Sequence, residues 1–360
     1  MGDFKAERAA IHGVLDKGRA ASALVAIVSA LFAMQAKAGA PTPLFASEAS
    51  ISISISAPWR DVVRLDPADE PLPGVLTIGG EDLDVTIGTR GKSRRRKEVC
   101  DFPPLRVTFA DKPPQSSLFH KQKSLKLVSY CRKSSSHQQI VLREYAVYKL
   151  YNAVTPASFR ARLANVAYVD AKSGKTDVER TGFFIEDLDD LADRVDAKKV
   201  ERGSVPISMY ARRDAARAAV FEYMISNIDW DMTAGPPGED CCHNIRIVGA
   251  TKTATSDLTP IPFDFDMSGV VDAPYWAAPP QVKVKSSTTR VYRGLCGHNA
   301  ETRAAAADFR PLRPAFEAAI AEVPGLSASN RKKATNFLAG FFKATADDAA
   351  IEKNLIKKCR

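Results

Sequence analysis

The chain has 360 residues and a net charge of +9, with 45% apolar and 26% charged residues. This composition excludes a disordered or fibrous chain and allows one large folded domain or two smaller ones. The moderate positive charge does not by itself indicate a nucleic-acid binder, because a bare run of basic residues is more often a solvated loop.

The first residues have the pattern of a secretory signal peptide. A basic stretch precedes an uncharged apolar run at 20–34, and the small residues Ala36 and Ala38 follow as a signal-peptidase pattern. The run is shorter than the roughly 20 residues that a membrane-spanning helix needs. We therefore predict a signal peptide at 1–38, a secreted or periplasmic protein, and no transmembrane segment once the signal is cleaved. The alternatives are an uncleaved anchor and a buried helix.

All six cysteines follow this segment. An even number of cysteines in an exported chain predicts structural disulfides. We expect the adjacent Cys241 and Cys242 to need distant partners rather than each other. A metal site at these residues and His243 is less favoured, because zinc ligands are usually separated along the chain.

The predicted elements after the signal begin with strands. Residues 39–57 are rich in Ala, Pro and Ser and are interpreted as a linker, whereas the alternation of Ile and Ser at 51–56 favours a first strand. Between 72 and 130, four short β-branched runs are separated by glycine, proline and charged turns, which predicts a sheet. Residues 140–154 carry apolar side chains near the helical period and predict a helix.

Two further strands are expected at 164–170 and 180–186. After residue 190 the pattern becomes mostly helical, with a strong helix at 213–225, a β section at 244–266 and alanine-rich helices broken by prolines at the end. This order predicts an α+β fold. It corresponds to a bilobal protein-kinase-like fold with a β-rich N-lobe at 58–187 and a helical C-lobe at 188–360.

The hairpin segment 229–269 carries the candidate chemistry. Asp229 lies in a loop after a helix, Asn244 precedes a strand, and Asp264 and Asp266 follow the returning strand. In kinases, an Asp accepts the acceptor hydroxyl's proton, while a later Asn and Asp hold Mg²⁺ on the nucleotide phosphates. Oxygen ligands suit Mg²⁺ or Mn²⁺. We predict Asp229 as the catalytic residue and Asn244 and Asp264 as metal ligands, with Asp266 as a second ligand or a turn cap.

The amino-terminal half offers candidates for binding ATP. Lys126 lies in an apolar strand and Glu144 in the following helix, which predicts the ion pair that positions nucleotide phosphates in kinases. Glu186 ends a strand, where we expect the backbone to contact adenine. The chain has no G-x-G-x-x-G loop; Arg90 and Lys92, in a glycine-containing turn after a strand, are the nearest candidates for phosphate contacts.

Several of these runs resemble one protein family. CDFPPLRVTF, the lysine-bearing strand, LREYAVYKLY, FFIED, NIDWD and PFDFDMSG make roughly residues 75–300 similar to the CotH kinase family of secreted and spore-coat protein kinases. The resemblance implies transfer of the ATP γ-phosphate to a protein Ser or Thr hydroxyl. It implies a catalytic role for Asp229, a metal at Asp264 or Asp266, and phosphate positioning by Lys126 with Glu144.

The spacing departs from the usual kinase pattern. Asn244 follows Asp229 by 15 residues, whereas the two are about five residues apart in protein kinases. This indicates an insertion, or a different base among Asp231, Glu239 and Asp240.

Three other classes of function stay open. A catalytically inactive kinase-like binding module is favoured by export, because ATP is scarce outside the cytoplasm. A small-molecule kinase or an adenylyltransferase would use the same nucleotide site. A nucleic-acid binder rests only on the basic run 90–97. We expect ATP with Mg²⁺ or Mn²⁺ as cofactors and a protein substrate as the partner.

Overall fold

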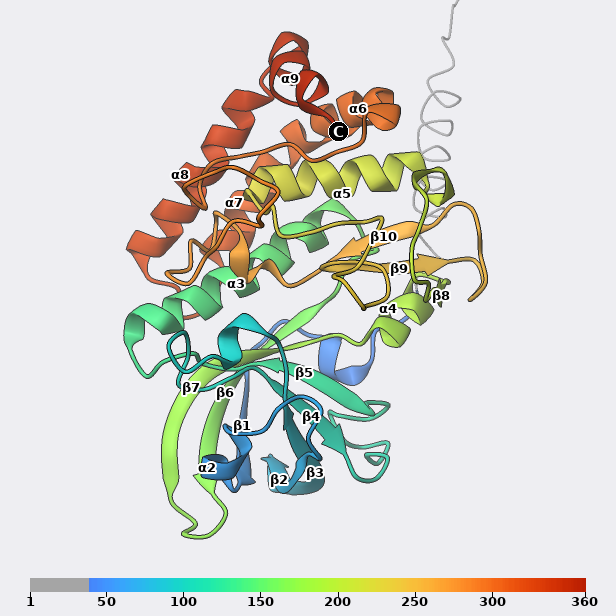
Figure 1. Ribbon diagram of the computed structural model, residues 1–360. Helices are drawn as coiled ribbons and strands as arrows, with labels where there is room; N and C mark the ends of the chain where they lie inside the picture. Colours follow the sequence, from blue (N-terminus) through green and yellow to red (C-terminus); the bar gives the residue numbers. More distant parts are fainter. Residues whose placement is uncertain (1–38) are drawn as a thin grey trace, which may run out of the picture. The chain divides into compact units, whose positions relative to one another are not determined.

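Seven strands close into a barrel in the computed structural model, which describes residues 39–360 (Figure 1). Their order around the barrel is β1-β2-β3-β4-β5-β7-β6; β1 and β6 are parallel, and the other neighbours are antiparallel. The strands are β1 (Ile51–Ala57), β2 (Leu72–Ile78), β3 (Glu81–Thr89), β4 (Leu105–Phe109), β5 (Ser124–Val128), β6 (Ala161–Asp170) and β7 (Thr176–Ile185).

The first strand corrects the predicted linker at 39–57. Ile51, Ile53 and Ile55 are buried in the barrel, and the serines between them are more exposed. Because side chains alternate between the two faces of a strand, the repeated Ile-Ser pattern places one apolar row in the core. The linker interpretation was therefore wrong for 51–57, and the alternative of a first strand is confirmed.

The helical elements follow the predicted order. The helix α3 (Ser135–Val154) packs on β6 and β7 and also contacts α7 and α8. The side chain of Ser134 accepts a hydrogen bond from the His137 N–H and caps its start. The other helices are α2 (Trp59–Val62), α4 (Leu188–Arg194), α5 (Arg212–Ile225), α6 (Asn299–Phe309), α7 (Arg313–Ala321), α8 (Ala328–Ala344) and α9 (Asp348–Asn354).

The predicted β section of the carboxy-terminal half is confirmed as a small antiparallel sheet. Its strands are β8 (Lys198–Lys199), β9 (Ile245–Gly249) and β10 (Thr259–Pro262), in the order β10-β9-β8. The helix α5 packs on β10. The loop after α5 and the turn after β10 therefore emerge close to this sheet.

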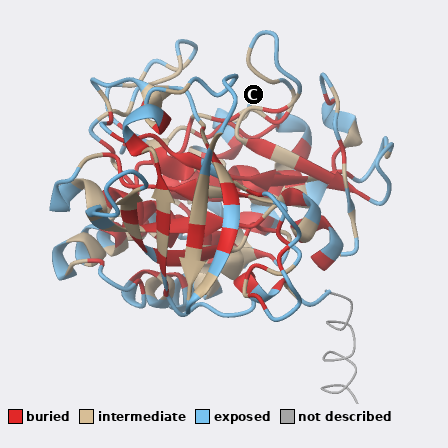
Figure 2. Ribbon diagram, turned by 90° about the horizontal axis from the view of Figure 1, so that it is seen from below, coloured by how far each residue is buried: buried red, intermediate tan, exposed pale blue. Residues whose placement is uncertain are grey.

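Two hydrophobic clusters hold these elements together. One fills the barrel, and the other surrounds α3, α5 and the carboxy-terminal helices. Figure 2 shows the buried residues on the inner strands and helices and the exposed ones mainly on surface loops. The mixed α/β content agrees with the predicted α+β class. The division into two lobes is not clear, because residues 39–360 form one compact unit and the amino-terminal strands close on themselves.

The six cysteines form three disulfides, as predicted. Two bridges join distant residues: Cys100 with Cys131, and Cys296 with Cys359. The third joins Cys241 to Cys242, so the expectation of distant partners for these two was wrong. The peptide between them is cis and their Cα atoms lie 3.0 Å apart, an arrangement that the sequence pattern did not indicate.

The predicted signal at 1–38 lies outside the described residues. In the part of the chain that the structure describes, no helix is long and apolar enough to cross a membrane.

Candidate active site

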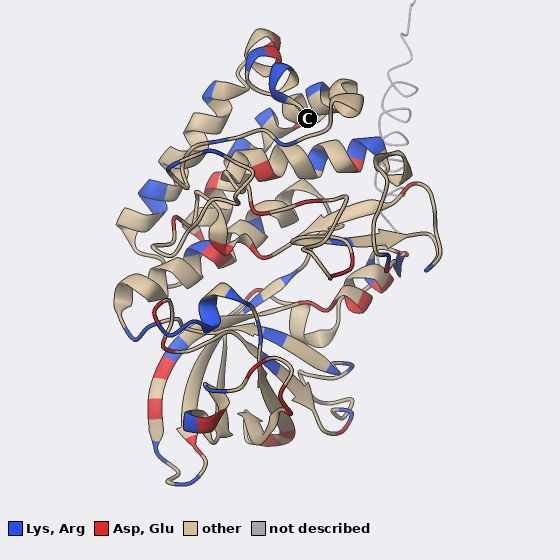
Figure 3. Ribbon diagram, viewed as in Figure 1, with Lys and Arg blue, Asp and Glu red and all other residues tan. Residues whose placement is uncertain are grey.

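A cavity of about 950 Å³ lies between the barrel strands and the sheet of the carboxy-terminal half. The barrel contributes the ends of β3, β4 and β5 with the loop 89–95, and the other half contributes the loops around β9 and β10. In Figure 3, basic segments in the barrel half face loops that carry acidic residues. The cavity brings together predicted site residues from both halves: Arg90, Lys92, Lys126, Asp229, Asn244, Asp264 and Asp266.

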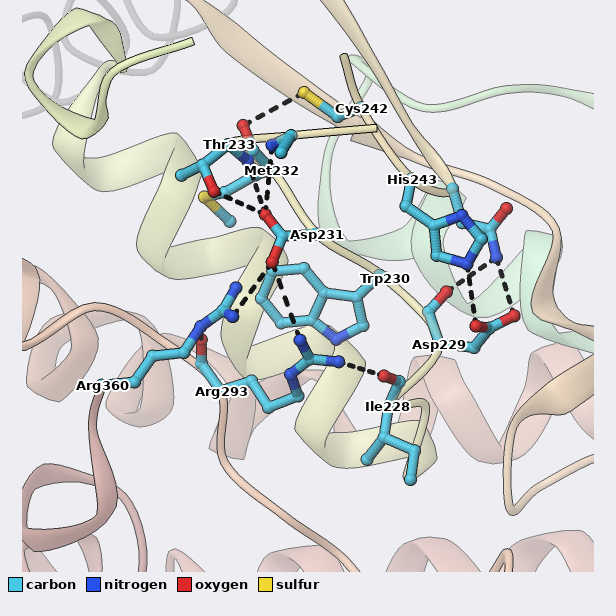
Figure 4. A network of polar contacts seen from close by, with 12 residues as sticks. Ile228, Asp229, Trp230, Asp231, Met232, Thr233, Cys242, His243, Arg293 and Arg360 are labelled. Atoms are coloured by element: carbon cyan, nitrogen blue, oxygen red, sulfur yellow. Dashed lines mark hydrogen bonds and ion pairs between the residues drawn. The ribbon is translucent and has the colours of Figure 1, made fainter. Parts of the chain in front are cut away.

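Asp229 is held by two neighbouring side chains (Figure 4). The helix α5 ends at Ile225, its C-cap Ser226 adopts a left-handed conformation, and the following loop carries Asp229 to the cavity. His243 Nε2 lies 2.8 Å from Asp229 Oδ1, and Asn244 Nδ2 donates to Asp229 Oδ2 at 3.1 Å and to its carbonyl oxygen at 2.7 Å. The bond with Asp229 raises the pKa of His243 above its ordinary value. Asp229 and Asn244, which are 15 positions apart in the sequence, are therefore in direct contact in the structure.

Two of the predicted metal ligands share an unusual backbone conformation. Asn244 has φ +53° and Asp264 has φ +63°, a left-handed region that Asn and Asp tolerate better than most residues. The N–H of Asp264 donates to the hydroxyl of Tyr148 at 3.1 Å, so the helix α3 fixes the turn after β10. Such conformations cluster at functional sites, where the surrounding contacts maintain them.

Asp264 and Asp266 differ in their surroundings. Asp264 is half-buried at the cavity, whereas Asp266 is 6% exposed. Burial raises the pKa of Asp266 above its ordinary value, and the nearby Asp264 carboxylate raises it further. The charge of Arg94 opposes this shift, so Asp266 lies between a negative and a positive neighbour.

The predicted pair of Lys126 and Glu144 is not formed. Glu144 Oε2 instead lies 3.4 Å from Arg94 Nη1, and both side chains are buried. Arg94 also donates to the carbonyl oxygen of Ser129 at 3.0 Å. Arg94 comes from the basic run 90–97, whose interpretation as a solvated loop was wrong at this residue. Lys126 lies on the rings of two aromatic residues, 4.9 Å from the centroid of Phe263 and 5.8 Å from that of Phe159.

Glu186 lies outside the cavity lining. Its carboxylate accepts from Arg194 Nε at 2.9 Å and Nη2 at 2.8 Å, and both residues are buried. Its backbone N–H donates to the carbonyl of Arg160 at 2.9 Å. This N–H is therefore already hydrogen-bonded within the protein. Asp187 and Leu188, the residues that follow, line the cavity.

The alternative base Asp231 is engaged elsewhere. Its Oδ1 accepts from the N–H and hydroxyl of Thr233, and its Oδ2 accepts from Arg360 at 3.0 Å (Figure 4). Although burial opposes ionisation, these hydrogen bonds keep the pKa of Asp231 below its ordinary value. Glu239, a second alternative, forms an ion pair with Lys92 across the cavity. Asp229 and the third alternative, Asp240, both line the cavity.

Three cavity residues with side chains suited to chemistry or anion binding were not among the predicted site residues: His243, Arg106 and Arg246. His243 was noticed only as a weak metal ligand beside two cysteines, although its spacing one residue before Asn244 was a usable signal. Arg106 and Arg246 also line the cavity. Arg246 stacks on Phe263, with 4.4 Å from the guanidinium carbon to the ring centroid.

No protein-family model matches this chain, and none of the curated proteins matches it in sequence. The similarity to CotH kinases therefore stays a prediction. Among solved structures, the chain is similar to the Helicobacter pylori proinflammatory kinase CtkA, with 10% identity, a TM-score of 0.38, and coverage of 70% of this chain and 92% of that chain. It is also similar to the Golgi casein kinase with Mn/ADP bound, with 10% identity, a TM-score of 0.34, and coverage of 87% and 78%. Likeness at this level shows neither the activity nor the substrate of this chain.

Proposed function

We propose that the chain is a kinase-like phosphotransferase that moves the γ-phosphate of ATP to a protein Ser or Thr hydroxyl. One observation carries the proposal: a single cavity collects Asp229, Asn244 and Asp264 from one half of the chain and Lys126 from the other. Phosphoryl transfer needs in-line positioning and neutralisation of phosphate charge rather than covalent chemistry by the protein. Opposed acidic and basic groups meet both needs.

The lining also provides a place for the nucleobase. Buried Val128, Leu188, Val200 and Ile247 form an apolar part of the cavity next to the polar residues. Ligand pockets of this volume are usually apolar with a few converging polar groups. In this proposal the base lies against these side chains and the phosphates extend toward Lys126 and Asp264.

Asp229 is the proposed acceptor of the substrate proton. As the substrate oxygen bonds to the γ-phosphorus, the bond from that phosphorus to the oxygen bridging to the β-phosphate breaks, and ADP leaves with the electron pair. A carboxylate has about four lone pairs. The contacts with His243 and Asn244 therefore leave room for the hydroxyl proton, and they orient Asp229 toward the cavity.

The donor set fits a divalent cation that enters with the nucleotide. Among residues 39–360, no three His, Cys, Asp or Glu side chains are arranged to hold a metal by themselves. Mg²⁺ is commonly held by one or two carboxylates together with substrate phosphates. Asp264, Asp266 and the side-chain oxygen of Asn244 would supply the protein ligands. When bound, Mg²⁺ or Mn²⁺ would neutralise charge on the β- and γ-phosphates.

Two substitutions separate the proposed roles. Asp264→Ala should lose metal-dependent nucleotide binding, measured by calorimetry with Mn²⁺ and a non-hydrolysable ATP analogue. Asp229→Ala should keep that affinity and lose transfer of labelled γ-phosphate. An affinity unchanged in Asp264→Ala would contradict the metal assignment, and undiminished transfer in Asp229→Ala would contradict the base assignment.

A further inference from the structure

The basic residues of the cavity fall into two groups. Eight Lys and Arg side chains line it. Four of them have a carboxylate partner in an ion pair: Lys92 with Glu239, Arg94 with Glu144, Arg95 with Asp66, and Lys199 with Glu201. The other four have no ion pair with any residue in 39–360: Arg90, Arg106, Lys126 and Arg246.

The four unpaired cations lie close to one another. Arg106 and Lys126 are directly opposite on the antiparallel strands β4 and β5. Like charges at opposed positions of a sheet destabilise it. Lys126 and Arg246 share the ring of Phe263, at 4.9 and 4.4 Å from its centroid. Arg90 follows the end of β3, the strand that pairs with β4.

Two of these cations act on the ionisation of Lys126. Burial lowers the pKa of Lys126 to about 7, and the charges of Arg90 and Arg246 add to this effect, while Asp187 and Asp264 oppose it. An anion bound among these side chains would remove the repulsion.

We propose that Arg90, Arg106, Lys126 and Arg246 form a binding site for a linear chain of phosphate groups, and that the site distinguishes a triphosphate from a monophosphate. The inference rests on the proposed function for its view of the nucleotide as the natural ligand. Arg106 and Arg246 are then further residues that determine specificity. Lys92, predicted to contact phosphate, is not part of this site, because its charge is already paired with Glu239.

Phosphate is the anion that best fits this group. The planar guanidinium groups of three arginines match pairs of phosphate oxygens. Four cations balance the charge of a triphosphate far better than that of a single carboxylate. A cavity of about 950 Å³ accommodates a small molecule rather than a nucleic-acid duplex.

The test is calorimetric titration of the full protein with inorganic phosphate, pyrophosphate and tripolyphosphate, without metal and at fixed ionic strength. Tripolyphosphate should bind more than about tenfold tighter than phosphate, since each added charge-assisted contact contributes about a factor of ten. Arg106→Gln and Arg246→Gln should each weaken the binding of tripolyphosphate about tenfold. Lys199→Gln, which removes a paired cation of the same cavity, should change the affinity for tripolyphosphate by less than about twofold.

Two results would overturn the inference. One is equal affinity for phosphate and tripolyphosphate. The other is an equal loss in Lys199→Gln and Arg106→Gln, since that would indicate only a general positive field. Arg106 is exposed, so its substitution tests the charge without disturbing the core, and thermal unfolding of each variant checks the fold.

The inference and the proposed function fail separately. If the cations bind tripolyphosphate as expected but the protein transfers no phosphate from ATP, the phosphotransferase proposal fails and the anion site stands. If transfer occurs but Arg106→Gln and Arg246→Gln leave the affinity for tripolyphosphate and for ATP unchanged, the anion site fails and the phosphotransferase proposal stands.

Discussion

Replacing Lys126 by methionine should stabilise the protein while weakening phosphate binding. Lys126 is half-buried between two aromatic rings, and it faces the positive Arg90 and Arg246 as well as the negative Asp187 and Asp264. The folded state therefore holds its proton less tightly than the unfolded chain does. Methionine keeps much of the length of the side chain and removes the charge.

The magnitude follows from the pKa of this one group. Its pKa falls from 10.5 to about 7 on folding. One pKa unit corresponds to about 1.4 kcal/mol, so a charged Lys126 lowers the free energy of unfolding by at most about 5 kcal/mol. Because the pKa of Lys126 is lower in the folded state, the free energy of unfolding increases as the pH rises. Below pH 7 both states carry the proton and the full cost is present. Between pH 7 and 10.5 only the unfolded state is protonated, so stability rises with pH.

Urea unfolding of the wild type and Lys126→Met at pH 6 and pH 10 measures this cost. We expect the variant to be more stable at pH 6 by about 2–5 kcal/mol, and the advantage to shrink by most of that amount at pH 10. Lys123→Met, an exposed lysine just before β5, is the matched control and should show no such pH-dependent difference. A Lys126→Met advantage that is the same at both pH values would show that the buried charge is not the source of the cost.

Two further substitutions test the neighbourhood of the cavity. His243→Ala should lower the transfer rate by about 10–100-fold with ATP affinity little changed, because the ring orients Asp229. His243→Gln should restore part of the rate. A loss of ATP affinity that parallels the loss of rate would contradict a positioning role. Glu186→Gln should lower the free energy of unfolding by about 3–5 kcal/mol, because it leaves the buried Arg194 unpaired. The double variant Glu186→Gln with Arg194→Met should recover part of that loss in urea unfolding, and a single variant as stable as the wild type would contradict a structural role for the pair.

Local patterns in the sequence predicted the secondary structure well. Apolar spacing located α3 and α5, and β-branched runs located β2 to β5. The same local reasoning proposed Asp229, Asn244 and Asp264 together, and the structure places all three at one cavity. Local patterns predict secondary structure because the helical and strand periods depend on residues that are close together in the sequence.

The pairing of charges could not be predicted in the same way. Arg94 is 50 residues from Glu144 in the chain, and only the folded path of the loop after β3 brings them together. Glu186 is a similar case, because its strand-end position suggested a nucleotide contact while the helix α4 supplied Arg194 to neutralise it. The choice among several possible partners depends on long-range packing, which residue spacing does not record.

The decisive experiment is to incubate the protein with Mn²⁺ and ATP labelled on either the γ- or the α-phosphate, and to measure label on protein hydroxyls. A phosphotransferase should transfer the γ-label and not the α-label, and Asp229→Ala should abolish the transfer. Transfer of α-label would indicate an adenylyltransferase instead. If neither label is transferred to the protein itself or to added protein substrates, and nucleotide gives no thermal shift, the phosphotransferase proposal is contradicted in favour of a non-catalytic binding module.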